Sequence, residues 1–265
     1  LVASALLSST AVYADDCTDT SATNCGITIS GNQTIDIDSS ISTTDEKGIN
    51  IINGSNTLTI DGNITTTTGT ANAAMGIRIS NVNAVNNVIN MTGDITTITN
   101  GSATNAHGIA VSSSASNNTV NITGNISTSG NTLSGILIRA SADNNNVTLT
   151  GDINMTGATN AFGVRILGTD ATNLSSDNVI TVNGNINTVW HSIDIGSFAT
   201  GNNIVVNGNV QSTGGGAVKI SVGSTNNVVV VNGNLTTTAT SGSPTIQIFD
   251  QATDNLIIID GNVTQ

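Results

Sequence analysis

Apolar residues along this chain follow a short pattern that repeats through almost its entire length. Its best preserved form is residues 118–128 (NTVNITGNIST), in which aliphatic side chains alternate with polar ones around a glycine. Apolar residues stand four and two positions before the glycine and two positions after it. The residue that directly follows the glycine is always Asn or Asp. Alternation with period two predicts a β-strand on each side of the glycine. The glycine returns every 24 to 33 residues, at Gly62, Gly93, Gly124, Gly151, Gly184, Gly208, Gly233 and Gly261.

A second motif, a triplet in which two apolar residues flank a variable one, lies between successive glycines and predicts a third strand. A repeat of this size cannot bury its own apolar residues, so neighbouring repeats must stack on one another. We therefore expect an all-β fold, a parallel, right-handed β-helix (β-solenoid) with three short strands per coil and about nine coils. The triplets are residues 49–51, 77–79, 109–111, 136–138, 164–166, 193–195, 218–220 and 246–248.

The eight glycines are expected to form a structural turn ladder. Glycine, and after it Asn or Asp, tolerates the positive φ that a sharp bend between two strands requires. Stacked Asn side chains are expected to hydrogen-bond from coil to coil. Two other folds fit the pattern less well. A disordered chain lacks aliphatic residues in fixed register, and a propeller blade needs about 40 residues and four strands.

The chain divides into three segments. Residues 1–14 (LVASALLSSTAVYA) are apolar, uncharged and rich in small residues, which predicts the remnant of a secretory signal peptide cleaved after Ala14. Residues 15–34 predict an N-terminal cap in which Cys17 and Cys25 form one disulfide. A zinc site is less consistent with this pair, because no His lies nearby. Residues 35–265 are β-helix repeats, which we expect to continue beyond this sequence. The longest stretch without a motif, residues 167–177, is expected to protrude as a loop.

Composition narrows the range of partners. The chain has 17 acidic and only 5 basic residues, a net charge of −12, which argues against nucleic acid or anionic lipid as a partner. Aromatic residues make up 2% of the chain, so we expect an aliphatic core and no aromatic platform for sugars or bases. No motif for a metal or a cofactor occurs, and we expect neither.

The outward positions of the triplets bring opposite charges together at one place, Arg165, Asp194 and Lys219. An enzyme acting on polysaccharides needs clustered carboxylates with a cation on one face, whereas the pattern favours a solvated sheet face with an ion pair. His107 and His191 occupy equivalent positions three coils apart, too far to share a metal. Trp190 is expected to pack at a corner. We expect no catalytic residues.

A signal-peptide end, a short Cys loop and coils of the form N-x-V-x-V-x-G-N-I-x-T resemble the N-terminal part of a bacterial autotransporter passenger domain. The resemblance implies export by type V secretion in a Gram-negative bacterium and an outer-membrane β-barrel in the C-terminal part. It also implies a location on the cell surface, anchored to the outer membrane, or outside the cell. No Gly-Asp-Ser-Gly protease motif occurs.

We therefore expect a non-catalytic stalk or adhesin whose partner is an unknown extracellular ligand or a host or cell surface. The alternatives are a β-helix polysaccharide lyase or hydrolase, and a haemagglutinin-like adhesin secreted by a two-partner system.

Overall fold

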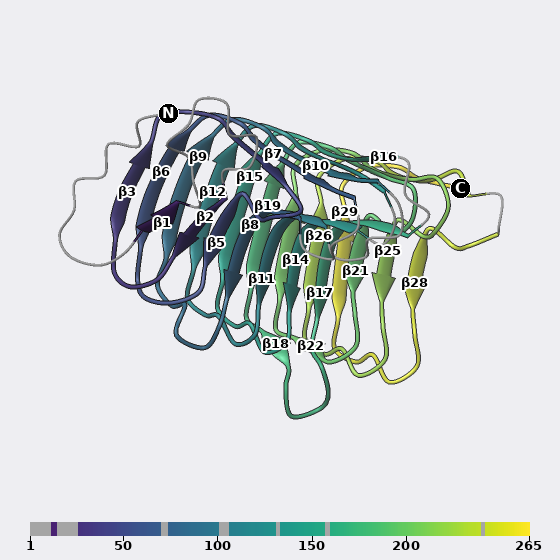
Figure 1. Cartoon of the computed structure of the whole chain (residues 1–265). Coiled ribbons are helices and arrows are strands. Elements are labelled where there is room, and N and C mark those ends of the chain that lie inside the picture. Colours follow the sequence, from purple (N-terminus) through teal and green to yellow (C-terminus); the bar gives the residue numbers. More distant parts are fainter. Residues whose placement is uncertain are drawn as a thin grey trace.

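The chain forms a β-solenoid, in which parallel sheets run side by side along one axis (Figure 1). This computed structural model contains β-strands, turns and irregular segments but no helix in its described part, and hence no helix long and apolar enough to cross a membrane. The all-β, parallel solenoid predicted from the repeat is confirmed. The described residues are 12–14, of which only the backbone is considered, 26–69, 74–100, 106–130, 133–156, 160–239 and 242–265.

Three long sheets make up the solenoid, and in each of them a strand pairs with the equivalent strand of the next repeat. The triplets form sheet 1, which consists of β2 (Ile27–Ile29), β5 (Ile49–Ile51), β8 (Met75–Ser80), β11 (His107–Ser112), β14 (Leu133–Arg139), β17 (Ala161–Leu167), β21 (Ile193–Ile195), β25 (Val218–Ile220) and β28 (Ile246–Ile248), with β1 (Val12–Ala14) antiparallel to β2.

The segments before each glycine form sheet 2, which consists of β3 (Thr34–Ile37), β6 (Thr57–Asp61), β9 (Val88–Thr92), β12 (Thr119–Thr123), β15 (Asn146–Thr150), β19 (Val179–Asn183), β23 (Asn203–Val206), β26 (Val228–Val231) and β29 (Leu256–Ile259). The segments after each glycine form sheet 3, which consists of β4 (Ile41–Thr44), β7 (Ile64–Thr68), β10 (Ile95–Thr99), β13 (Ile126–Ser129), β16 (Ile153–Thr156), β20 (Ile186–Thr188), β24 (Val210–Ser212), β27 (Leu235–Thr237) and β30 (Val263–Thr264).

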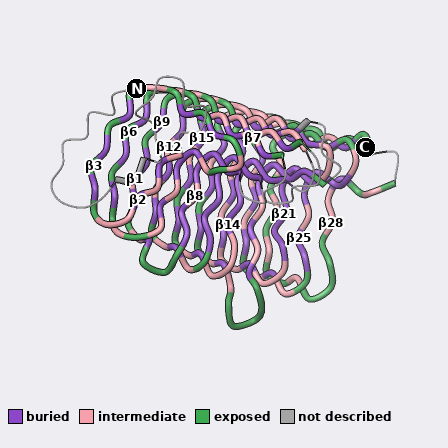
Figure 2. The backbone as a smooth tube through the Cα atoms, viewed as in Figure 1, coloured by how far each residue is buried: buried purple, intermediate pink, exposed green. Residues whose placement is uncertain are grey.

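The apolar columns of the repeat face the interior of the solenoid, as predicted (Figure 2). Ile89, Val120 and Val147 pair in register across sheet 2, and each is completely buried. Because β-branched side chains stack on copies of themselves along the axis, the core is aliphatic and continuous. Burial decreases in the last repeat, where the side chains of Ile248 and Val263 are 56% and 53% exposed.

A column of buried asparagines lies at the corner before sheet 2. The backbone N–H and the Nδ2 of Asn118 both donate to Oδ1 of Asn145, at 3.0 and 2.9 Å, and Nδ2 also donates to the Ala84 carbonyl at 3.1 Å. Each amide therefore acts as donor and acceptor, a pair of roles that an ionised carboxylate does not provide. The buried asparagine ladder consists of Asn56, Asn87, Asn118, Asn145, Asn178, Asn202 and Asn227, and it ends on the half-buried Asn255.

A second ladder, at the solvent-facing corner after each glycine, explains why Asp alternates there with Asn. The backbone N–H of Asn125 donates to Oδ1 of Asp94 at 2.7 Å, and that of Asn185 donates to Oδ1 of Asp152 at 2.7 Å. This ladder requires an acceptor from the preceding repeat, which a carboxylate supplies as well as an amide does. Asp is therefore compatible with this position.

The glycines are required mainly by close stacking of the backbone. Only Gly93, Gly124 and Gly151 of the eight have positive φ, so the expectation that positive φ explains the whole column is wrong for the other five. A Cβ on any of the eight would lie 2.0–2.5 Å from backbone atoms of the preceding repeat. At Gly233, for example, it would meet the carbonyl oxygen of Gly208 at 2.4 Å.

The predictions for the N-terminal segment and for the protruding loop have different outcomes. Cys17 and Cys25, the predicted disulfide, lie outside the described residues. Ile27 and Ile29, expected to begin a partial first coil, form β2, which pairs in parallel with β5. The loop predicted within residues 167–177 protrudes between β17 and β18 (Ser175–Ser176), which pairs with β22 (Ala199–Thr200) (Figure 1).

Replacing Asn145 with Ala should lower the free energy of unfolding by about 1–3 kcal/mol, because buried donors of Asn118 lose their acceptor. Asn121→Ala is the matched control, since its amide bonds Asn90 at the surface, and its effect should stay within about 0.5 kcal/mol. Urea unfolding followed by circular dichroism measures both values. Equal losses in the two variants would contradict the assignment of stability to the buried ladder.

Replacing Gly233 with Ala should destabilise the fold by about 1–3 kcal/mol, because the new methyl group overlaps the backbone of the preceding repeat. Gly69→Ala is the control, since a Cβ there meets nothing within 4 Å. Thermal unfolding of both variants tests the stacking argument. A tolerated substitution at Gly233 would show that the repeats can move apart at this corner.

Candidate functional site

The positive charges of this acidic protein are collected on sheet 1. Arg78, Arg139, Arg165 and Lys219 lie in strands of sheet 1, and the fifth cation, Lys47, lies just before β5. The strands of sheets 2 and 3 that the structure describes contain no Lys or Arg. Asp194 is the only acidic residue in the described strands of sheet 1. Although the net charge of the protein is −12, one face of it is positively charged. We call it the basic face and define it by Arg78, Arg139, Arg165 and Lys219.

Asp194 lies at the centre of a buried ion-pair cluster. Parallel pairing places Arg165, Asp194 and Lys219 on three adjacent strands. Arg165 Nε lies 2.9 Å from Asp194 Oδ2, and Lys219 Nζ lies 3.5 Å from Oδ1. The ion pair expected from the register is thus present, but the expectation of a solvated face is wrong at Asp194, whose side chain is 0% exposed. The two cations, 29% and 24% exposed, cover the carboxylate and leave the cluster with one excess positive charge.

Aromatic side chains extend this cluster toward the corner before sheet 1. Arg165 Cζ lies 4.2 Å from the centroid of the buried Phe162 ring, which is a cation–π distance. The His191 ring lies 6.0 Å from Phe162 and 5.1 Å from the half-buried Trp190, centroid to centroid. Parallel stacking thus places Phe162 beside Arg165, with His191 and Trp190 next to it.

The pKa values of both histidines are lowered, and the two rings lie in separate places. Burial, reinforced by Arg139 and Arg165, lowers the pKa of His107 to about 3, and its Nδ1 accepts the Ser134 N–H at 3.1 Å. Burial also lowers the pKa of His191, whose Nδ1 donates to the Gly216 carbonyl at 2.9 Å. Strands β14 and β17 separate β11 from β21, so the two rings do not form one site, as the register predicted.

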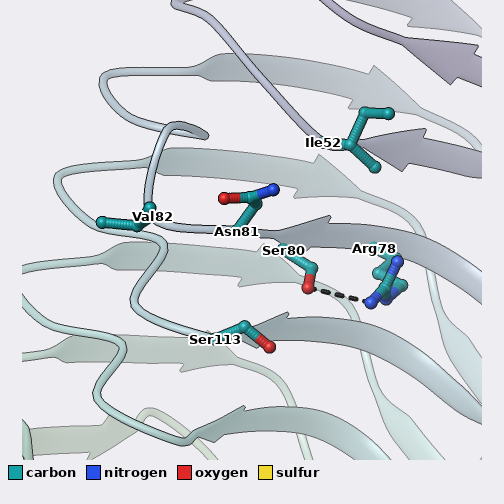
Figure 3. Close-up of a pocket in the computed structure, with 6 residues that line it drawn as sticks. All are labelled: Ile52, Arg78, Ser80, Asn81, Val82 and Ser113. Atoms are coloured by element: carbon teal, nitrogen blue, oxygen red, sulfur yellow. Dashed lines mark hydrogen bonds between the residues drawn. The ribbon is translucent and has the colours of Figure 1, made fainter.

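A shallow hollow of about 490 Å³ lies at the other end of the basic face (Figure 3). Arg78 projects beside it, donating to Ser80 Oγ at 2.8 Å and to Asn50 Oδ1 at 3.1 Å. Burial and the nearby Arg139 lower the pKa of Arg78, because both oppose its charge. The lining residues are Ile52, Arg78, Ser80, Asn81, Val82 and Ser113.

This arrangement suits non-covalent binding of anionic groups better than acid–base chemistry. A pair of carboxylates is the usual requirement for glycoside hydrolysis, and Asp194 stands alone among the described strand residues of sheet 1 while already engaging two cations. In the described ranges, no group of three or more His, Cys, Asp or Glu residues is placed to hold a metal ion. No protein-family model, curated protein or solved structure matches this chain.

Sequence reasoning found part of this site. It placed Arg165, Asp194 and Lys219 together, but it missed Arg139 and Phe162, which lie outside the triplets. A signal for Arg139 was available, because it directly follows the triplet 136–138 and three of the other four cations lie within triplets. The contact of Phe162 with Arg165 carries no such signal, since it depends on side-chain packing that the repeat pattern does not determine.

The stability of the protein should fall as the pH drops from about 6.5 toward about 3. In the unfolded chain His107 has its ordinary pKa near 6.5, whereas the folded pKa is about 3, so the unfolded state binds the proton first. One such group contributes a slope of up to about 1.4 kcal/mol per pH unit, and His191 adds to it in the same direction. Urea unfolding at a series of pH values measures the slope. His107→Gln should flatten it, and an unchanged slope in this variant would refute the assignment.

Proposed function

We propose that this chain is a non-catalytic passenger domain of a bacterial autotransporter and acts as a stalk or adhesin at the cell surface. The observation that carries the proposal is the solenoid itself: over the described residues its strand pairing continues from β2 to β30, and its core extends from Ile27 to the partly buried Ile259. An elongated body stabilised by contacts between neighbouring repeats suits a spacer, and its long outward faces suit recognition. The N-terminal signal-like segment and the Cys pair agree with export.

In detail, we propose a right-handed β-helix of about nine coils with three strands each. Sheets 2 and 3 contain nine strands apiece, and strands of the three sheets alternate along the chain. Right-handed crossovers are the general rule for parallel strands. A disulfide between Cys17 and Cys25 would close the N-terminal cap, and a C-terminal outer-membrane β-barrel would export the passenger by the type V route.

The segment Val12–Ala14 gives this proposal a specific consequence. Its backbone pairs antiparallel with β2 at the edge of sheet 1. Cleavage after Ala14 would remove this strand and leave the edge of β2 to the Cys-containing cap. The mature N-terminus therefore decides which segment covers the edge.

One observation favours a second candidate. Arg165, Asp194 and Lys219 place a carboxylate and two cations on one face, which is part of what a β-helix polysaccharide lyase or hydrolase requires; such an enzyme needs a second carboxylate beside Asp194. A haemagglutinin-like adhesin of a two-partner system would use the same solenoid without its own barrel. The reading frame beyond Gln265 distinguishes these candidates.

The proposal predicts surface display after expression of the complete gene in a Gram-negative host. An epitope tag inserted after Asp170, which is exposed in the loop between β17 and β18, should be accessible to antibody on intact cells, because such loops tolerate insertion. N-terminal sequencing should find Asp15 first, and the frame beyond Gln265 should encode amphipathic strands of a transmembrane barrel.

A matched gene that lacks residues 1–14 should leave the tag inside the cell. Retention of residues 1–14 in the mature protein, together with a tag that stays intracellular in the complete gene product, would overturn the proposal.

A further inference from the structure

We propose that the basic face of sheet 1 binds a linear anionic polysaccharide, one that carries carboxylate or sulfate groups. The inference names a ligand class for the proposed adhesin and in that sense rests on the proposed function. Its physical basis is local charge, which differs in sign from the net charge of −12. A surface that gathers the scarce cations of an acidic protein on one sheet is complementary to a polyanion.

The carboxylates of the protein do not fully neutralise the cations of this face. Among the described residues, Arg78 donates only to the neutral Asn50 and Ser80, and no carboxylate lies within ion-pair distance of it or of Arg139. Arg165 and Lys219 share the single carboxylate of Asp194, and both remain partly exposed. An anionic ligand would therefore pair with charges that the fold itself does not neutralise.

The spacing of the cations favours an extended ligand along the solenoid axis. Arg78 and Arg139 are two strands apart in sheet 1, Arg139 and Arg165 lie on adjacent strands, and Arg165 and Lys219 are again two strands apart. Two strand spacings are roughly 10 Å, which is close to the length of an extended disaccharide. A polysaccharide with one acidic sugar in each disaccharide matches the spacing within each of the two outer pairs and is long enough to reach both pairs, whereas a small anion would engage only one or two of the cations.

The two ends of the face offer contacts for sugar rings. The hollow beside Arg78 combines the hydroxyls of Ser80 and Ser113 with the apolar side chains of Ile52 and Val82 (Figure 3). Sugar rings have polar edges and apolar faces, so a mixed lining of this kind suits them. At the other end, the half-buried Trp190 lies beside His191 and offers a ring for stacking.

A nucleic acid fits this surface less well. Duplex DNA carries one negative charge for about every 1.7 Å of its axis, far denser than cations spaced by one or two strands. Its phosphates would also approach the acidic corners next to sheet 1, which carry Asp143, Asp177 and Asp254. A polysaccharide with widely spaced charges avoids that repulsion.

The test uses the full 265-residue chain and a hyaluronan hexasaccharide, which has one carboxylate in each disaccharide, as the probe. Titration calorimetry at low salt should detect binding that weakens as the ionic strength rises. The fluorescence of Trp190, the single Trp, should change on binding. The double variant Arg78→Gln, Arg139→Gln should bind roughly tenfold more weakly, and a cooperative melting transition checks that it is folded after the bonds of Arg78 to Asn50 and Ser80 are lost. Lys47→Gln, a cation outside the basic face, should bind as the parent does.

Three outcomes would overturn the inference. Undiminished binding by the double variant would move the ligand to another face. Equal binding of neutral maltohexaose would remove the role of charge, and equal or tighter binding of a single-stranded oligonucleotide would assign the face to nucleic acid. These measurements use purified protein and do not depend on its location in the cell. If the purified chain binds the probe but is never displayed on cells, the proposed function is refuted and the inference about the basic face stands.

Discussion

The structure depends on one constraint, the in-register stacking of each repeat on the next. Main-chain hydrogen bonds set the distance between repeats, and the buried asparagine ladder satisfies the polar groups of the corner that turns into sheet 2. The same constraint explains the glycine column, since the backbone of one repeat leaves no room for a Cβ on the next. A repeat contributes to stability only through its two neighbours, as in other solenoids.

Stacking also divides the sequence positions between two roles. Inward positions must be aliphatic or hydrogen-bonded, and they hardly vary. Outward positions are restricted much less, so charge can be distributed among the sheets without disturbing the core. Sheet 3 carries no charged residue in its strands, sheet 2 carries only acidic ones, and sheet 1 carries Arg78, Arg139, Arg165 and Lys219. The candidate site arises from this freedom of the outward positions.

The repeat register was sufficient to predict the solenoid, its inward columns and the partnership of Arg165, Asp194 and Lys219. It was insufficient for features that depend on three-dimensional packing. Asp194 was expected to be solvated, yet the long side chains on the two adjacent strands cover it completely. The sequence pattern explains the glycines by positive φ, whereas at five of the eight positions the reason is the short distance to the backbone of the preceding repeat. A periodic sequence pattern does not reveal that distance. Arg139 and Phe162 lay outside the motif and were missed for that reason.

The segregation of charge has a consequence for how such a rod lies against its surroundings. With cations on sheet 1 and acidic residues in sheet 2 and at the corners, the charge distribution gives the molecule an electric dipole across its short axis. In the field of an anionic layer this dipole produces a torque that turns the basic side toward the layer. The rod would then lie flat, and its contact area would grow with the number of repeats, unlike that of a fibre that touches only with its tip.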